Sequence, residues 1–228
     1  GIKSSNKTSS ITQVVLSTTL VTNLLASGGG DEVALVLLPG PGLNFRNIDF
    51  LPHTYIATGA INFRGRVTEP LDQKEIEEIG KLIVDAGLHK VAVVGKFSQR
   101  NSSHERKVEE ILKGRYSHLE VFRGFEVSGQ LNFPRRAVTT YYTAVTREKW
   151  AGFAAGIEKA IRDRGIASPI NILKADGGTM PLEVSLHYPC ETVFSGPAAS
   201  VMGAFALTMD RQTSVVVDIG GTTTDLAL

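Results

Sequence analysis

The chain has 228 residues, of which 42% are hydrophobic and 21% charged, a composition typical of one large globular domain or two small ones. Its 24 basic and 23 acidic residues give a formal charge of +1 and form no block of like charge, which argues against a nucleic-acid partner. The longest apolar runs are far shorter than the roughly 20 residues of a membrane span. The first segment has no apolar core of a signal peptide, and Cys190 is the single cysteine, so we expect a cytoplasmic protein outside the membrane.

The first elements are a short strand, a short helix and a buried strand. Residues 13–16 predict a short strand or the end of a helix. Ser17 or Thr18 is then placed to cap a short helix, which the glycines at 28–30 end. The continuous apolar run at 33–38, followed by proline and glycine, predicts a buried strand.

The next stretch predicts a hairpin, a helix and a strand. Residues 54–72 alternate in polarity and contain two glycines, which is typical of a β-hairpin. Asp72 with Glu75 three residues later is close to a capping box, so a helix begins there and ends at Gly87. The apolar run within 90–98 predicts a strand.

Strands and helices continue to alternate in the second half. A helix is expected at 103–114, a strand at 118–124, a long helix at 133–164 and a strand at 170–174, followed by a helix of small residues at 195–207. This order predicts an α/β fold with a mostly parallel sheet and flanking helices.

The stretch VVVDIGGTTTDLAL at 215–228 predicts a strand, a turn and a second strand. Paired glycines let the backbone approach an anion, and consecutive N–H groups with threonine hydroxyls surround a phosphate oxygen. Asp218 is placed to hold a hydrated Mg²⁺, for which one carboxylate is enough. The alternative is a plain hairpin with Asp218 and Asp225 in solvent. The predicted phosphate-binding residues are Gly220, Gly221, Thr222, Thr223 and Thr224, and Asp218 is predicted as metal ligand and catalytic residue.

Two other places carry candidate site residues. Asp176 follows the strand at 170–174, and ligands of doubly wound sheets bind beyond the carboxyl ends of strands, yet Asp176 also fits a simple turn. Ser195 and Gly196 begin a helix whose N-terminus suits the anionic cofactor, although Ser195 fits a helix cap as well. The same two interpretations apply to the hydroxyl-rich helix start at Ser17, Thr18, Thr19, Thr22 and Asn23.

A pair of arginines opens the long helix. Arg135 and Arg136 either clamp a carboxylate or phosphate or lie on a solvent-exposed helix face, and the second interpretation is the commoner one for arginines.

The hairpin sequence DIGGTTTD resembles a phosphate hairpin of the actin, sugar kinase and heat-shock ATPase superfamily, and with the preceding helix it resembles the second of the two hairpins. More narrowly, nearly the whole chain resembles the hydantoinase A and 5-oxoprolinase family of the N-methylhydantoinase A type. The matching stretches are LSTTLVTNLLASG, GRVTEPLD, FSQRNSSHERKVEEIL, FEVSGQLNFPRRAVTTYYTAV, ADGGTM and FSGPAASVMGA, followed by DIGGTTTDLAL.

The resemblance implies the ribonuclease H-like half of an actin-like ATPase fold, with mixed or mostly parallel sheets and flanking helices. It implies a family N-terminal region at 1–168, without the first phosphate hairpin, and the start of the hydantoinase A core at 169–228. The first hairpin would precede Gly1 and a second half would follow Leu228, so we expect an inactive segment of a larger enzyme.

That enzyme is expected to use ATP and Mg²⁺ to hydrolyse a cyclic amide of the hydantoin or 5-oxoproline type by phosphorylating the amide oxygen. Asp176 is the expected general base or substrate orienter. A second hydantoinase-type subunit and an oligomeric state are implied by the resemblance. The alternatives are an ATP-dependent carboxylase subunit, similar to acetone carboxylase, and an ATP-gated binding module without enzymatic activity.

Overall fold

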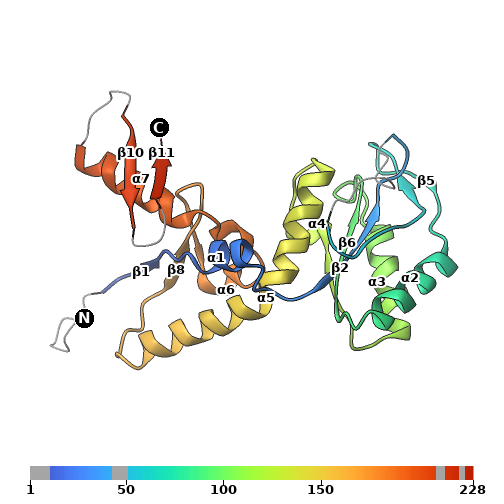
Figure 1. The fold of residues 1–228 in the computed structure, drawn as a ribbon, viewed down its shortest axis with the longest axis horizontal. Coiled ribbons are helices and arrows are strands. Elements are labelled where there is room, and N and C mark those ends of the chain that lie inside the picture. Colours follow the sequence, from blue (N-terminus) through green and yellow to red (C-terminus); the bar gives the residue numbers. More distant parts are fainter. Residues whose placement is uncertain (1–10, 43–50, 209–213, 221–223, 228) are drawn as a thin grey trace. The chain divides into compact units, whose positions relative to one another are not determined.

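The computed structural model describes residues 11–42, 51–208, 214–220 and 224–227. Within them the chain forms two compact units, and helix α5 (Phe133–Arg162) contributes to both (Figure 1). Unit 1 comprises Gly1–Gly29 and Thr146–Leu228, and unit 2 comprises Gly30–Val145. These are spatial units and not family regions, so the expected division at residue 168 stays a prediction.

Unit 2 contains a four-stranded sheet that is parallel throughout, as the alternation of strands and helices predicted. Its order is β3 (Thr54–Ile56), β2 (Val33–Leu38), β6 (Lys90–Gly95) and β7 (Glu120–Arg123). All six residues of β2 and five of the six of β6 are buried, as expected for central strands of a parallel sheet covered on both faces.

Helices α2 (Gln73–Asp85) and α3 (Ser103–Arg115) supply apolar side chains to one core of unit 2. Ile76 and Ile83 of α2, and Val108 of α3, are fully buried in the cluster that also holds alternate residues of β2 and β6. The helical spacing of these apolar residues therefore reflects the face that each helix buries.

At the start of α2, the helix cap predicted from the sequence is present, but the predicted capping box is not complete. Oδ1 of Asp72 accepts hydrogen bonds from the N–H groups of Lys74 and Glu75, at 2.9 and 3.3 Å, so Asp72 is the expected cap. Glu75 does not complete a capping box, because its Oε2 accepts from the Thr58 N–H at 2.6 Å. Glu75 thus ties the helix to the segment that follows β3.

The segment at 54–72 is only partly the hairpin that its pattern predicted. β3 pairs in parallel with β2, while β4 (Ala60–Ile61) and β5 (Val67–Glu69) form a short antiparallel pair. The prediction was wrong for β3 because β3 pairs with the preceding strand β2, which lies outside the segment whose pattern indicated a hairpin.

The end of β6 is held by two fully buried charged residues. Glu105, in the first turn of α3, accepts hydrogen bonds from the N–H groups of Gly95 and Phe125 at 2.8 and 3.0 Å. Arg136, in the first turn of α5, donates to the carbonyl oxygens of Gly95 and Gln130, both at 2.6 Å. The exposed-face interpretation is therefore wrong for Arg136.

Burial governs the acid–base behaviour of both groups. It raises the pKa of Glu105, against the hydrogen bond from Gly95, and lowers the pKa of Arg136, against the attraction of the Glu105 carboxylate. The short helix α4 (Gly124–Val127) supplies the second N–H donor to Glu105.

Unit 1 is built on a three-stranded mixed sheet of order β1 (Val14–Leu16), β8 (Ile170–Leu173) and β9 (Thr179–Pro181). β1 and β8 are parallel, whereas β8 and β9 are antiparallel. The N-terminal strand is thereby paired with a strand that lies some 150 residues later in the chain. Such a long-range pairing is determined by tertiary packing and not by local sequence.

Helices of unit 1 pack around the buried Trp150 of α5, whose indole N–H donates to the Ser185 hydroxyl at 3.0 Å. They are α1 (Leu20–Ser27) and α6 (Leu182–Ser185), and the 3-10 helix η2 (Pro189–Thr192) contacts α1. The N-cap of α1 is Thr19, whose side chain makes no capping hydrogen bond, so neither Ser17 nor Thr18 is the cap that the sequence predicted. Thr18 precedes the cap, and its Oγ1 accepts from the Leu20 N–H at 3.1 Å.

The last elements of unit 1 are helix α7 (Ser195–Thr208) and a separate antiparallel pair, β10 (Val216–Ile219) and β11 (Thr224–Ala227). Figure 1 shows the pair beside α7. Within the described ranges, no helix combines the length and the apolar character that a membrane crossing needs.

Replacing Arg136 by alanine is expected to destabilise unit 2 by about 3 kcal/mol, because Glu105 would remain buried without a nearby positive charge. The measurement is native-state hydrogen exchange at the amides of β6. Arg135→Ala is the matched control, since Arg135 is exposed on the same helix turn and should change stability by less than about 0.5 kcal/mol. Equal effects of the two substitutions would contradict the importance of the buried charges.

Candidate functional site

The two strands predicted within 215–228 are confirmed by β10 and β11. The two strands are antiparallel, with Asp218 directly opposite Asp225 and Ile219 opposite Thr224. Gly221, Thr222 and Thr223 lie outside the described residues. Gly220 and Thr224 are exposed at the two ends of the turn. The phosphate-binding role of all five residues stays a prediction.

Asp218 lies on the face of the hairpin that meets α7. Its carboxylate Oδ2 accepts a hydrogen bond from the hydroxyl of Ser200, a residue of α7. The neighbouring residues Val217 and Ile219 point to the other face of the strand and are 51% and 77% exposed. The carboxylate of Asp218 therefore lies on the face of the hairpin that contacts α7.

The hairpin fits a magnesium ion in the chemistry of its donors. Asp218 is exposed, and Asp225 faces it across the strand pair, where two like charges repel each other unless a cation is close. Magnesium is usually held by one or two carboxylates together with water and phosphate oxygens. In the described part of the chain, no group of three or more His, Cys, Asp or Glu is placed to hold a metal ion.

Asp176 lies in the turn between β8 and β9, where both of its carboxylate oxygens accept hydrogen bonds. Oδ1 accepts from the Gly178 N–H at 2.9 Å, and Oδ2 accepts from Nζ of Lys174 at 2.8 Å. The hydrogen bond from Lys174, followed by that from Gly178, lowers the pKa of Asp176. A carboxylate with a lowered pKa is a weak base near neutral pH, so these contacts suit a substrate-orienting role better than a general base.

The Asp176 turn also packs against α7. Gly177 has a φ of +81°, and a Cβ atom there would lie 2.9 Å from the sulfur of Met202, a residue of α7. Helix α7 therefore contacts the segments of both predicted acids, through Met202 for Asp176 and through Ser200 for Asp218.

Ser195 and Gly196, at the start of α7, lie against the start of α1. The Ser195 hydroxyl is fully buried, 3.3 Å from both the Thr18 carbonyl oxygen and the Ser17 hydroxyl. A Cβ atom on Gly196 would lie 3.6 Å from the Thr19 methyl group. Ser195 is thus used in packing the two helices together, and the role of both residues in binding the cofactor stays a prediction.

A second contact joins the same two helix ends. Phe194 donates its N–H to Oγ1 of Thr22 at 3.2 Å, and it adopts a φ of +61° with 59% of its surface exposed. The hydroxyl-rich start of α1, which the sequence marked as a candidate, is therefore brought next to the start of α7. The positive ends of the two helix dipoles meet there, an arrangement that favours an anion.

Sequence analysis did not find Ser200. Its contact depends on how α7 packs against β10, and a serine in a run of small residues carries no spacing signal for such packing. The opposition of Asp218 and Asp225 could have been deduced, because the turn length of the hairpin fixes which residues face each other.

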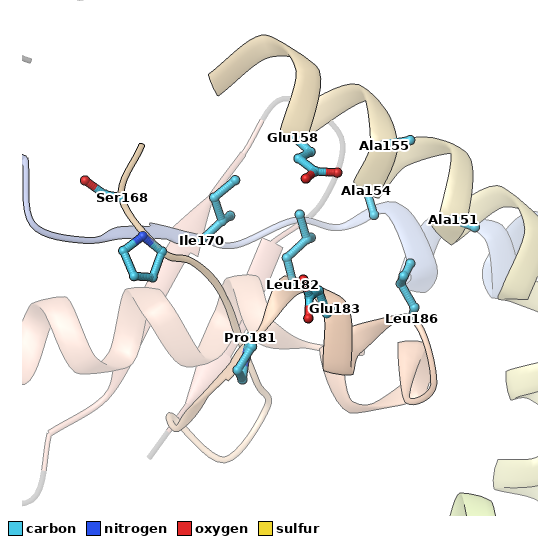
Figure 2. A pocket seen from close by; sticks show the side chains of 11 residues that line it. Ala151, Ala154, Ala155, Glu158, Ser168, Ile170, Pro181, Leu182, Glu183 and Leu186 are labelled. Atoms are coloured by element: carbon cyan, nitrogen blue, oxygen red, sulfur yellow. The ribbon is translucent and has the colours of Figure 1, made fainter. Parts of the chain in front are cut away.

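The pocket shown in Figure 2 lies elsewhere in unit 1 and has a volume of about 430 Å³. It is mainly apolar, with the Glu158 carboxylate directed from α5 toward Leu182. Its lining residues all lie within 151–186, so the pocket is separate from the candidate phosphate site on β10 and β11. The lining residues are Ala151, Ala154, Ala155, Glu158, Ser168, Pro169, Ile170, Pro181, Leu182, Glu183 and Leu186.

The α/β units with flanking helices have the fold class that the sequence predicts. The chain belongs to the hydantoinase/oxoprolinase family. The profile of the hydantoinase/oxoprolinase N-terminal region matches residues 2–116, and the hydantoinase/oxoprolinase profile matches residues 136–228.

The relatives include enzymes that act on different substrates. 5-Oxoprolinase 1 of Arabidopsis thaliana is 32% identical over 71% of this chain and 13% of its own length. Caprolactamase subunit alpha of Pseudomonas jessenii is 24% identical over 75% of this chain and 25% of its own length. The chain thus spans about a quarter or less of the length of such curated relatives.

Solved structures share the fold. The nucleotide-free structure of acetone carboxylase, from work on ATP-dependent acetone carboxylation, matches with a TM-score of 0.80 and 20% identity, over 93% of this chain and 34% of that one. The ATP-dependent caprolactamase from Pseudomonas jessenii matches with a TM-score of 0.74 and 21% identity, over 97% and 35%. The fold class predicted from the sequence is therefore confirmed.

Replacing Lys174 by methionine is expected to raise the pKa of Asp176 toward its ordinary value, because the largest cause of the lowered pKa is the hydrogen bond from Lys174. Asp176 would then take up its proton at a higher pH than in the unmodified protein. The measurement is an NMR titration of the labelled aspartate carboxyl carbon. Lys159→Met, which removes the partner of Asp163, should leave this titration unchanged. An unaltered pKa in the Lys174 variant would show that Gly178 alone sets it.

Proposed function

We propose that this chain is the part of an ATP-dependent enzyme that binds the phosphates and activates a cyclic amide of the hydantoin or 5-oxoproline type. The observation that carries the proposal is the β10–β11 hairpin, which presents the exposed Asp218 next to a glycine and threonine turn in a chain of the hydantoinase/oxoprolinase family. The relatives support the proposal, because 5-oxoprolinases and a caprolactamase subunit are among the proteins similar to this chain.

The chemistry explains why such a reaction needs ATP. The carbonyl carbon of a cyclic amide is a poor electrophile because the ring nitrogen donates its electron pair to the carbonyl group. Transfer of the γ-phosphoryl group to the amide oxygen releases ADP and makes that carbon electrophilic. Water then adds to the carbon, the C–N bond breaks and the nitrogen takes a proton, which yields a ring-opened acyl phosphate. A second water hydrolyses this acyl phosphate to the ring-opened acid and free phosphate. Catalysis of the first step rests on positioning and on neutralising phosphate charge.

The residues of this chain would divide that work. The backbone and hydroxyl groups of Gly220, Gly221 and residues 222–224 would bind the phosphate oxygens. Asp218 would hold Mg²⁺, which when bound supplies positive charge to the phosphates. Asp176, already ionised and held by Lys174, would orient the substrate.

A second candidate keeps the phosphate chemistry and changes the substrate. The match to acetone carboxylase favours it, because that fold is associated with an ATP-dependent carboxylation. In that case the activated oxygen would belong to a carbonyl compound or a carbonate. The names of two relatives contain the word subunit, so we also propose that the complete protein works with a second kind of subunit.

Asp218→Ala in the full-length protein is expected to reduce lactam-stimulated ATP hydrolysis by at least about a hundredfold, because the charge that organises Mg²⁺ is lost. The measurement is phosphate release from ATP with 5-oxoproline or hydantoin added separately. Asp163→Ala, which removes an exposed carboxylate of unit 1 far from the hairpin in sequence, is the control and should keep full activity.

Other outcomes distinguish the alternatives. ATP hydrolysis that rises with a ketone and bicarbonate, and not with a lactam, would favour the carboxylase. Hydrolysis that rises with neither substrate but with a protein client would favour an ATP-gated binding module. Full lactam-dependent activity in Asp218→Ala would contradict the role of the hairpin.

A further inference from the structure

We propose that Ser200 is a positioning residue for Asp218, holding the carboxylate in the orientation in which it takes up the cation. This inference rests on the proposed function, and it adds a residue of α7 to the candidate cation site, whose predicted ligand is Asp218. Ser200 belongs to α7 and Asp218 to β10, two neighbouring elements of unit 1 (Figure 1).

The hydrogen bond itself is unusual for a serine in a helix. A serine or threonine hydroxyl inside a helix commonly donates to the carbonyl oxygen four residues earlier. Thr208, on the same helix, does so with Ala204 at 3.0 Å. Ser200 instead donates to Oδ2 of Asp218, outside its own helix. Its hydroxyl therefore serves the contact between α7 and the hairpin.

Asp218 needs such a partner because little else fixes its side chain. It is exposed, and the only hydrogen bond to its carboxylate within the described ranges comes from Ser200. The half-buried Asp225 lies directly opposite and repels it. A neutral donor on α7 offsets this repulsion and selects one rotamer. Ser200 bonds to Oδ2, so this contact leaves Oδ1 for a cation.

The composition of α7 fits this arrangement. Glycine and alanine make up six of the 14 residues of the helix, whose sequence is SGPAASVMGAFALT. Small side chains let the helix backbone approach the hairpin closely, and serine is the smallest residue that also donates from its side chain. Alanine at position 200 would keep the packing and lose only the donor.

The test measures cation affinity and does not depend on turnover. Binding of a fluorescent ATP analogue to the full-length protein is titrated with Mg²⁺, and the half-saturating Mg²⁺ concentration is recorded for each variant. Ser200→Ala is expected to raise this concentration about tenfold to a hundredfold, the usual effect of removing a group that orients a metal ligand. Ser200→Thr, which keeps the hydroxyl, should restore most of the affinity.

Two controls separate positioning from a structural effect. Thr208→Ala removes a hydroxyl of the same helix that bonds only within the helix, and should leave the Mg²⁺ dependence unchanged. In an Asp218→Ala background, Ser200→Ala should have no further effect, because a positioning residue acts only through the group that it orients. A further loss in that background would overturn the inference.

The remaining outcomes distinguish this inference from the proposed function. If Asp218→Ala abolishes the Mg²⁺ dependence but Ser200→Ala does not change it, the site stands and the role of Ser200 is refuted. If nucleotide binding by the unmodified protein does not respond to Mg²⁺, or if Asp218→Ala leaves that response intact, the proposed site fails and the role of Ser200 fails with it.

Discussion

The packing of helix α7 is the constraint on which the candidate site depends. One residue of the helix, Met202, fills the space beside Gly177 in the Asp176 turn, and another, Ser200, bonds to Asp218 in the hairpin. The start of the same helix is buried against α1 through Ser195. A shift of α7 would therefore disturb the Asp176 turn, the hairpin and the start of α1 together. For this reason the position of α7, a helix without charged side chains, matters to a candidate site whose acids are Asp176 and Asp218.

A different interaction organises unit 2. The N–H and the carbonyl of Gly95 are bonded to two buried charged side chains, Glu105 and Arg136, which come from the first turns of two different helices. Buried charges are costly unless they are paired and hydrogen-bonded, so they persist only where the surrounding elements are closely fixed. The network therefore defines where α3 and α5 begin relative to the end of β6.

The sequence predicted the elements that local pattern controls. Helix α2 and its Asp72 cap, the buried strand β2 and the hairpin of β10 and β11 all follow from spacing within a few residues. The errors lie where distant segments decide. β3 pairs in parallel with β2 instead of forming a hairpin with the strand that follows it. An arginine early in a helix usually lies in solvent, but Arg136 is buried and donates to the carbonyl oxygen of Gly95 at the end of β6. Ser200 belongs to the same class, since only tertiary packing gives its hydroxyl a function.

The division between phosphate chemistry and substrate choice explains how one fold serves different reactions. Under the proposed function, a lactam-opening enzyme and a ketone carboxylase would both gain from turning an oxygen into a phosphorylated leaving group, and the charge to be neutralised would be the same in each. The hairpin would hold the phosphates, Asp218 would hold the cation and α7 would orient Asp218, so all three would meet that shared need. The choice of substrate depends on groups that contact the carbon skeleton, so it can change while the hairpin and α7 keep their arrangement.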